Sequence, residues 1–504
     1  MERENDLESH GDTPGRTRVY LPSPRNQSSD FTRMTRALAR PARNTLAGLL
    51  AVTTALAASP ASAQRIPGQL FDTEMEALLA DYARPILERA GQGSGRIRVR
   101  ILNNPTFNAF VIDGRNIYMH TGVLTAAATP NQVIGVLAHE TGHITAAHIS
   151  DLRNQVTSLQ NRSLLLQLLG IGLMVAGALA GGDAASGAGG AGQAVMAGGS
   201  ETLLRAFLRE RQAQEASADQ AGLDLLRKTG QSGRGMLETF ERLAEDNRFS
   251  LGDTYKRTHP LERTRIALLR ERAQQSEFFN KADPAELQLR HDMVKAKLAG
   301  YLNVPQTVFN MYPAADKSLP ARYARAIARL KQGQTGNFEG ALADIDSLIR
   351  DQPASPYFYE VKGDFLMKHG QAARAVGAFR KATELSKGAP QIETQLAKAI
   401  IESGEPNLAD EAVRRLKSAL RGEDDSEKLA GTYIETWRLL SQAYGAKKLN
   451  AEAALAQAEA EVRIGNFKLA RERAMIAQRA LKPGSVDWLR ADDIVNIKPE
   501  EPKR

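Results

Sequence analysis

The amino-acid sequence predicts an α+β domain, mostly helical with a small sheet, followed by an all-α solenoid of helical repeats. Three patterns in the 504 residues predict this fold class. Charged and aliphatic residues alternate near residue 100, as in a half-buried strand. Two long segments with helical spacing follow, at 133–150 and 201–228. Beyond residue 318, large and small residues recur with a period of 34, which is typical of stacked helix pairs.

The composition is that of a globular protein, with 42% hydrophobic and 25% charged residues. The chain has no cysteine, which excludes a disulfide scaffold, a thiol nucleophile and every cysteine-ligated metal site. A transition metal would therefore need imidazole and carboxylate ligands, and the chain has eight histidines. The formal net charge is +8, but the 66 basic and 58 acidic residues are intermingled, so we expect no nucleic-acid partner.

Residues 1–63 have the pattern of a secretory signal. The stretch 44–63, NTLAGLLAVTTALAASPASA, is apolar, ends in small residues and follows several arginines. We expect cleavage after Ala63 and a mature protein outside the cytoplasm. Met34 would be a more ordinary start, which would make residues 1–33 a mis-assigned extension. The alternative, an uncleaved membrane anchor, is less favoured because the apolar core is short.

The first folded domain, residues 64–275, is expected to begin with strands and to continue with helices. The expected elements are strands at 96–102, 108–112 and 116–119 and helices at 133–150 and 201–228. Asp113 and Gly114 form the tight turn between the second and third strands. Pro130 supplies the break before the first long helix, and Gly230 ends the second.

The rest of the chain is expected to be helical, with a connector at 276–317, repeats at 318–482 and a loose tail at 483–504. Ala341 and Ala375 occupy equivalent positions 34 residues apart. A period of 34 in helix pairs is the signature of tetratricopeptide repeats, and about four units fit the length. The alternative is an unrelated helical bundle.

His139-Glu140-Thr141-Gly142-His143 is an H-E-x-x-H motif within a predicted helix. One helical turn separates the histidines, so both imidazoles leave the same face and can hold one zinc ion. Glu140 lies beside them without ligating and can take a proton from the attacking water. The alternative is a pair of surface histidines on an amphipathic helix.

Two histidine ligands need a third partner, and the second long helix offers two acids. Glu215 and Asp219 are four residues apart and share a helical face. The first can ligate zinc, while the second can accept a hydrogen bond from a ligand imidazole. Taken alone, two acids at this spacing more often form a solvated face.

These motifs, in their order, resemble the M48 family of zinc metallopeptidases. The resemblance rests on HETGH, on E-x-x-A-D at Glu215–Asp219, on His259-Pro260 and on Arg265-Ile266. It implies an α+β zincin-type metallopeptidase domain with one zinc ion, Glu215 as third ligand and Asp219 as supporting acid. Relatives usually carry Ser-Arg shortly before the ligand Glu, where this chain has Arg211-Gln212. That departure concerns the helix contacts at this point and leaves the ligand unaffected.

The order of signal, peptidase domain and repeats resembles that of periplasmic members of the family. It implies a zinc-dependent endopeptidase that acts on unfolded or stalled outer-membrane proteins, with the outer-membrane β-barrel assembly machinery as partner. The rival hypothesis is a repeat-based periplasmic chaperone or adaptor with minor protease activity. Stacked helix pairs make a concave surface suited to holding a peptide, which supports either function.

Residues 163–182 form an uncharged apolar stretch long enough to span a bilayer, and a Gly/Ala-rich tract continues to residue 200. His143 and Glu215 must meet at one metal ion, so a single membrane span between them is excluded. We therefore interpret 163–200 as a helical hairpin that lies on the membrane surface or is covered by protein. The protein would then be peripheral to the membrane.

Four further histidines, His120, His148, His291 and His369, are not expected to bind the metal. His148 lies five positions after His143, off the ligand face. His120 could line the substrate cleft or simply pack. Arg265 could stabilise a developing oxyanion or support helix packing.

His259 precedes Pro260, so it is either a local turn residue or a group at the zinc. A histidine here could occupy the fourth metal position that catalysis needs for water. The site would then open only when the loop around Gly252–Thr258 moves. A third interpretation makes His259 a stabiliser of the transition state.

Overall fold

The computed structural model describes residues 68–111, 114–146, 201–245, 253–332, 338–422 and 433–497. All of them belong to one compact unit, Ala61–Pro499. The predicted signal, the apolar segment 163–200 and His148 lie outside the described residues. Within these ranges, no helix combines the length and the apolarity needed to cross a bilayer.

The sheet has four strands in the order β1-β2-β4-β3. The strands are β1 (Gln69–Leu70), β2 (Arg98–Leu102), β3 (Ala109–Val111) and β4 (Asn116–His120). β2 and β4 are parallel, while β3 pairs with β4 in antiparallel register, Ala109 facing Met119. β3 is therefore an edge strand. The two-residue strand β1 was not predicted, since so short a strand leaves no alternation in the sequence.

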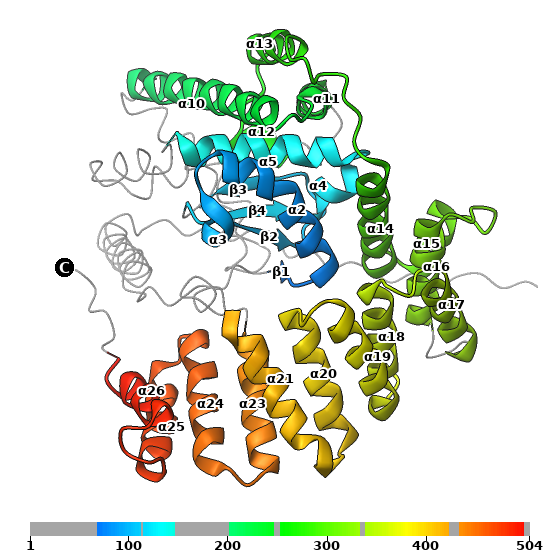
Figure 1. Ribbon diagram of the computed structural model, residues 1–504. Coiled ribbons are helices and arrows are strands. Elements are labelled where there is room, and N and C mark those ends of the chain that lie inside the picture. The colour runs from blue at the N-terminus through cyan, green and yellow to red at the C-terminus, as the bar shows by residue number, and fades with distance from the viewer. Residues whose placement is uncertain are drawn as a thin grey trace, which may run out of the picture. The chain divides into compact units, whose positions relative to one another are not determined.

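The helices of this domain are α2 (Thr73–Arg89), α3 (Gly93–Arg96), α4 (Thr121–Ala126), α5 (Pro130–Thr145), α10 (Glu201–Lys228), α11 (Arg234–Glu245), α12 (Asp253–Thr258) and α13 (Arg263–Gln274). α2, α4 and α5 contact the strands, α10 and α11 pack on α5, and α13 packs on α10 and α11 (Figure 1). α10 has the predicted bounds. α5 begins three residues earlier than predicted, because Pro130 is its first residue, where a missing N–H is tolerated, and not a break before it.

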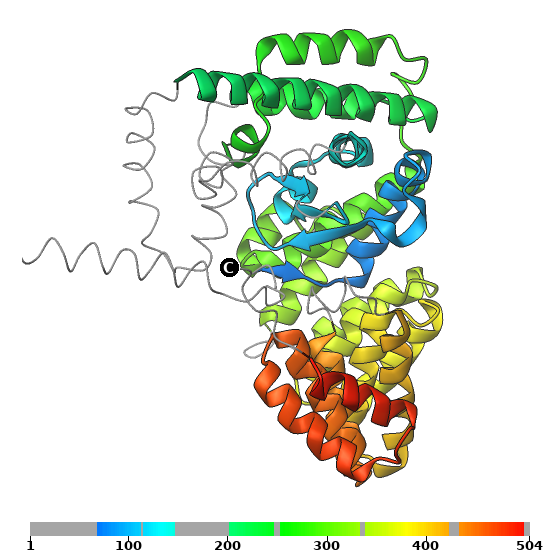
Figure 2. The ribbon, with the colours of Figure 1, turned by 90° about the vertical axis from the view of Figure 1, so that its left-hand side faces the viewer.

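α10 lies directly over α5 in both ribbon views (Figures 1 and 2). Glycines allow the two backbones to approach closely. A Cβ added at Gly142 of α5 would lie 2.5 Å from the carbonyl oxygen of Ala218 in α10. One added at Gly222 of α10 would lie 3.1 Å from the backbone of Ala138 in α5. This close contact brings the two motif-bearing faces together.

The C-terminal half consists of helices arranged in pairs. They are α14 (Ala285–Leu302), α15 (Pro305–Met311), α16 (Leu319–Gln332), α17 (Phe338–Asp351), α18 (Pro356–Lys368), α19 (Ala372–Leu385), α20 (Pro390–Ser403), α21 (Ala409–Ala419), α23 (Ile434–Ala446), α24 (Asn450–Ile464), α25 (Phe467–Ala480) and α26 (Val486–Val495), with 3-10 turns η2 (Pro406–Leu408) and η3 (Leu420–Gly422). α17 and α19 begin 34 residues apart, as do α18 and α20. The helix pairs thus keep the predicted period in this part of the chain.

The prediction of a loose tail from residue 483 is wrong. Ser485 caps α26 by accepting a hydrogen bond from the backbone N–H of Trp488. Ala491 and Ile494 of α26 are buried against α24 and α25. The short helix was missed because only two of its side chains point into the core.

The predicted connector is helical but is part of two cores. Val294 and Leu298 of α14 belong to the core of the sheet domain. Met293 and Ala296, on the other side of the same helix, belong to the core of the first repeats. α14 therefore joins the two halves by burial on both faces.

Candidate metal centre

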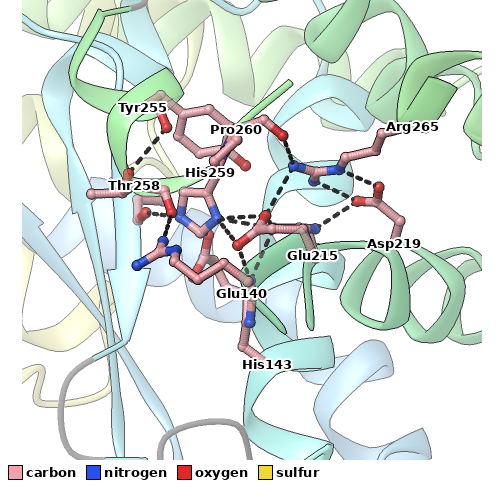
Figure 3. A network of polar contacts seen from close by, with 12 residues as sticks. Glu140, His143, Glu215, Asp219, Tyr255, Thr258, His259, Pro260 and Arg265 are labelled. Atoms are coloured by element: carbon pink, nitrogen blue, oxygen red, sulfur yellow. Dashed lines mark hydrogen bonds and ion pairs between the residues drawn. The ribbon is translucent and has the colours of Figure 1, made fainter. Parts of the chain in front are cut away.

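The predicted metal ligands come from two helices and one loop, and they meet in the structure. His139 and His143 belong to α5, Glu215 belongs to α10, and His259 follows the C-terminus of α12. Figure 3 shows His143, Glu215 and His259 pointing toward one another. One ligand atom from each of the four residues lies within 4.8 Å of the others. His139, Glu215 and His259 are buried, and only His143 keeps slight exposure.

The spacing of these atoms is close enough for them to share one metal ion. Bonds of about 2.0–2.1 Å in a tetrahedral zinc site place the ligand atoms about 3.3 Å apart. His139 Nε2 lies 3.2 Å from both His143 Nε2 and His259 Nδ1. Glu215 Oε2 lies 3.4 Å from His139 Nε2 and 3.0 Å from His259 Nδ1. Glu215 Oε1 lies 3.4 Å from His143 Nε2. The residues present therefore fit a metal ion with nitrogen and oxygen ligands.

Asp219 and Arg265 contact the candidate ligands His139 and Glu215 without joining the ligand cluster. Asp219 Oδ1 lies 2.9 Å from His139 Nδ1, which orients the imidazole so that Nε2 faces the other ligands. The Arg265 guanidinium donates two hydrogen bonds to Asp219, at 2.6 and 2.8 Å, and its Nη1 lies 2.9 Å from Glu215 Oε2. Arg265 is thus fully engaged with the two acids. This arrangement does not favour our oxyanion interpretation of Arg265.

The electrostatics of the site follow from burial and from these partners. Burial alone would raise the pKa of Glu215, but facing His259 and His143 hold it well below its usual range. Burial likewise opposes ionisation of Asp219, and the hydrogen bonds from Arg265 and His139 outweigh it, so its pKa is lowered. For Glu140, burial prevails and raises the pKa. The three carboxyl groups are therefore suited to different chemical roles.

Glu140 is 1% exposed, and its Oε1 accepts no hydrogen bond from the described residues. This oxygen lies 3.6 Å from His259 Nε2, beside the ligand cluster but outside it. An unsatisfied buried carboxylate of raised pKa is a good proton acceptor. The geometry agrees with the role predicted for Glu140.

His259 makes contacts through both ring nitrogens. Nδ1 faces Glu215 and His139, while Nε2 lies 3.3 Å from the carbonyl oxygen of Ala109 in the edge strand β3. The ring stacks on Tyr255, with centroids 4.5 Å apart. The segment expected to be a mobile loop before His259 is in fact helix α12 from Asp253 onward, so that part of the prediction is wrong.

The sequence analysis did not identify the contacts that hold His259 in place. Tyr255 is completely buried, and its position one helical turn before His259 could have indicated that the two side chains meet. Arg211 donates to the carbonyl of Thr258, and Gln212 donates to Glu262. The pair that departs from the usual Ser-Arg thus ties α10 to the segment that carries His259.

The remaining described histidines have structural contacts. His120 is buried at the end of β4, with Nδ1 2.9 Å from Thr106 Oγ1. His291 is buried between the Tyr82 hydroxyl and the Ala127 carbonyl, each 3.1 Å away. His369 Nδ1 lies 2.9 Å from the Phe365 carbonyl oxygen. None of them is in the ligand cluster.

Comparison with known proteins agrees with this geometry. The sequence model of peptidase family M48 matches residues 74–273. The chain is 24% identical to the beta-barrel assembly-enhancing protease of Escherichia coli (strain K12), over 78% of this chain and 76% of that protein. It is 23% identical to the protein of the same name in Yersinia pestis, over 82% of each chain.

A second kind of relative matches a smaller share of the chain. Metalloprotease LoiP of Escherichia coli (strain K12) is 30% identical over 38% of this chain and 71% of its own length. The range that the family model matches, 74–273, includes the H-E-x-x-H helix, the acids of α10 and His259. The chain therefore belongs to peptidase family M48 and is a metallopeptidase.

Proposed function

We propose that this metallopeptidase is a periplasmic zinc-dependent endopeptidase that acts on unfolded or stalled outer-membrane proteins. The observation that carries the proposal is the convergence of His139, His143 and Glu215 beside the buried Glu140. The names of the relatives and the predicted signal support the location and the client class. We assign residues 318–482 to tetratricopeptide repeats that bind the assembly machinery, and 163–200 to contact with the membrane surface.

His139, His143 and Glu215 would hold the zinc ion, because imidazole and carboxylate are ligands that zinc accepts in this geometry. Zinc, when bound, supplies a Lewis acid that polarises water and the scissile carbonyl. Glu140 takes the proton of the attacking water and returns it to the leaving amine. Asp219 and Arg265 keep the ligand side chains in place throughout.

The substrate would be held as an added strand on β3. The backbone carbonyl of Asn108 accepts a hydrogen bond from the backbone N–H of His120, at 2.9 Å. Since hydrogen-bonded and non-hydrogen-bonded pairs alternate along an antiparallel ladder, Ala109 and Met119 form a non-hydrogen-bonded pair. The carbonyl of Ala109 therefore points to the free edge of the sheet, beside the metal ligands. An extended polypeptide could pair there and reach the catalytic residues.

We further propose that His259 is a latch. Its Nδ1 lies beside Glu215 and would occupy the fourth metal position that catalysis needs for water, and its Nε2 meets the Ala109 carbonyl. The enzyme would then be closed at rest. Such a latch suits a protease that is surrounded by unfolded proteins, most of which it must spare.

The test of the catalytic role is Glu140→Gln in the full chain. This variant should bind zinc normally, because Glu140 is not a ligand, and should cleave an unfolded outer-membrane protein about 10²–10⁴-fold more slowly. Metal analysis and a cleavage assay measure the two properties separately. Normal cleavage by the variant, or purified protein without zinc, would refute the proposal.

The test of the latch is His259→Ala. We expect basal cleavage or self-cleavage to rise several-fold while zinc remains bound. Loss of activity with zinc retained would instead make His259 a stabiliser of the transition state. Unchanged activity would reduce it to a packing residue.

The stacked helix pairs keep a second function open, that of a chaperone or adaptor with minor protease activity. Complementation of a deletion strain with Glu140→Gln distinguishes the two. Full rescue favours the chaperone, and loss of rescue favours the protease.

A further inference from the structure

His259 lies in a short connection between two helices. α12 ends at Thr258 and α13 begins at Arg263, so residues 259–262 lie outside both helices. We call residues 258–262 the latch segment. A change in the backbone angles of so short a connection can move His259 while the helices stay in place. The contacts of the latch segment therefore decide how readily His259 leaves the ligand cluster.

Two neighbouring side chains of α10 hold the latch segment at its two ends. Arg211 donates a hydrogen bond to the backbone carbonyl of Thr258, and Gln212 donates one to the carboxylate of Glu262. Carbonyl groups at a helix C-terminus need partners from outside the helix, and the helix dipole favours a cation there. The carboxylate of Glu262 is a charged acceptor, which strengthens the second hydrogen bond. α10 thus restrains the segment on both sides of His259.

The latch segment has two further anchors, and both also serve other parts of the site. Arg265 Nη1 donates to the Pro260 carbonyl at 2.9 Å, and the same guanidinium holds the two acids of α10. Thr258 Oγ1 donates to Asn108 Oδ1 at 3.3 Å, directly before the edge strand β3. A change at Arg265 or Asn108 would disturb the ligands or the sheet edge. The two donors of α10 are the better place to weaken the segment alone.

We propose that Arg211 and Gln212 are positioning residues that clamp the latch segment and set the fraction of molecules in which His259 has left the metal centre. The inference rests on the latch proposed at His259. A client strand competes with His259 for the Ala109 carbonyl, so it binds the open form. Its apparent affinity is then proportional to the open fraction. The clamp therefore sets the client concentration at which cleavage begins.

The experiment measures cleavage of a denatured outer-membrane protein by the full chain with Arg211→Met or Gln212→Ala. Each variant removes one hydrogen bond of the closed state, which should increase the open fraction about 2–10-fold. We expect KM to fall by the same factor, with kcat within about twofold of the unaltered protein and the zinc content unchanged. A merely structural defect beside Glu215 would instead lower kcat or the zinc content.

Arg209→Met and Gln220→Ala are the matched controls, because both change exposed side chains of the same helix. Neither should alter KM. Arg211→Lys keeps a cationic donor, so its KM should lie closer to that of the unaltered protein than the KM of Arg211→Met. Gln212 is exposed, and Gln212→Ala keeps the test valid if the partly buried Arg211 cannot be replaced without unfolding. Circular dichroism melting monitors the fold of each variant.

Hydrogen–deuterium exchange provides a second measurement that does not depend on cleavage. The backbone N–H of His259 donates to the Tyr255 carbonyl at 2.6 Å, so its exchange reports opening of the segment. Deuterium uptake in residues 258–262 should rise in both clamp variants, with zinc bound and after chelation, and in neither control. Unchanged uptake in both clamp variants would overturn the inference.

Combination with His259→Ala separates failure of the clamp from failure of the latch. Arg211→Met should add nothing to the cleavage rate of His259→Ala, because the group that the clamp positions is already gone. An equal gain in both backgrounds would overturn the inference. If His259→Ala raises basal cleavage and neither clamp variant does, the clamp is refuted and the latch stands. Unchanged cleavage by His259→Ala would refute the latch and, with it, the clamp.

Discussion

Asp219 contacts the candidate metal centre only through its neighbours. It faces His139 Nδ1 at 2.9 Å and receives both hydrogen bonds from Arg265, without contributing a ligand atom. Asp219→Ala should therefore weaken zinc binding by about 10–100-fold, because the His139 ring loses the group that orients it. Competition with a chelator of known affinity measures the effect.

Asp224→Ala is the control, since Asp224 lies on the same helix and outside the ligand cluster. It should bind zinc like the unaltered protein. If Asp219→Ala also binds normally, the hydrogen bond from His139 is not what orients the ligand.

At the level of residues, the sequence predicted what lies within one helix. His139 and His143 are one turn apart, as are Glu215 and Asp219, so their shared faces follow from helical geometry alone. The pairing of Arg265 with Asp219 spans 46 positions and depends on how α13 packs on α10, which no local spacing encodes.

At the level of elements, the contact between α5 and α10 depends on the small size of Gly142. The Cβ of an alanine there would lie 2.5 Å from the Ala218 carbonyl, so the two helices would have to separate. Gly142→Ala should destabilise the protein by about 1–3 kcal/mol and weaken zinc binding, because the ligands lie on opposite sides of this contact. Thermal melting and chelator competition report the two effects.

Gly377→Ala provides the comparison. Gly377 is exposed in α19, and a Cβ there would meet nothing within 4 Å. The change should be neutral or stabilise by about 0.5–1 kcal/mol, through helix propensity alone. If both variants lose similar stability, the tight contact at Gly142 is not the cause.

The bounds of the helices and strands were predicted best for long elements with a regular hydrophobic pattern. α10 spans 28 residues with a regular apolar face, and its ends were predicted correctly. β1 and α26 are short, and tertiary contacts define them, so neither left a sequence signal. The helix of the H-E-x-x-H motif and the edge strand could be expected individually, but their juxtaposition could not.

At the level of the whole molecule, a buried charged network joins the first helix of the peptidase domain to the repeats. Lys297 of α14 lies 2.8 Å from Asp72, 3.3 Å from Glu74 and 3.5 Å from Glu360 of α18. Thr73 donates to Glu360 at 3.2 Å. One lysine thus faces three acids, so the network carries an excess of negative charge when all are ionised.

This excess makes stability depend on pH. Burial raises the pKa of Glu360 to about 8 from an ordinary value of 4.5. It also raises the pKa of Glu76, a carboxyl of α2 outside this network, to about 7. The folded chain therefore keeps protons that the unfolded chain releases, so the stabilisation is complete below about pH 4.5 and is lost as the pH rises towards 8. The melting temperature should fall between pH 5.5 and pH 8.

Glu360→Gln tests the origin of this fall. The variant cannot ionise, so its melting temperature should decrease less over the same range than that of the unaltered protein. Glu339→Gln, on the exposed surface of α17, should leave the pH dependence unchanged. A parallel decrease in all three proteins would place the titrating groups elsewhere.

His259 contacts both the ligand cluster and the Ala109 carbonyl at the sheet edge, and this has a consequence for the choice of client. A segment that pairs with β3 competes with His259 for the same carbonyl, so docking and unlatching are thermodynamically linked. If His259 is the latch that we propose, the free energy that lifts it would come from the backbone pairing of the client. A chain with an unpaired strand to donate would supply it, so cleavage would depend on how far the client has folded.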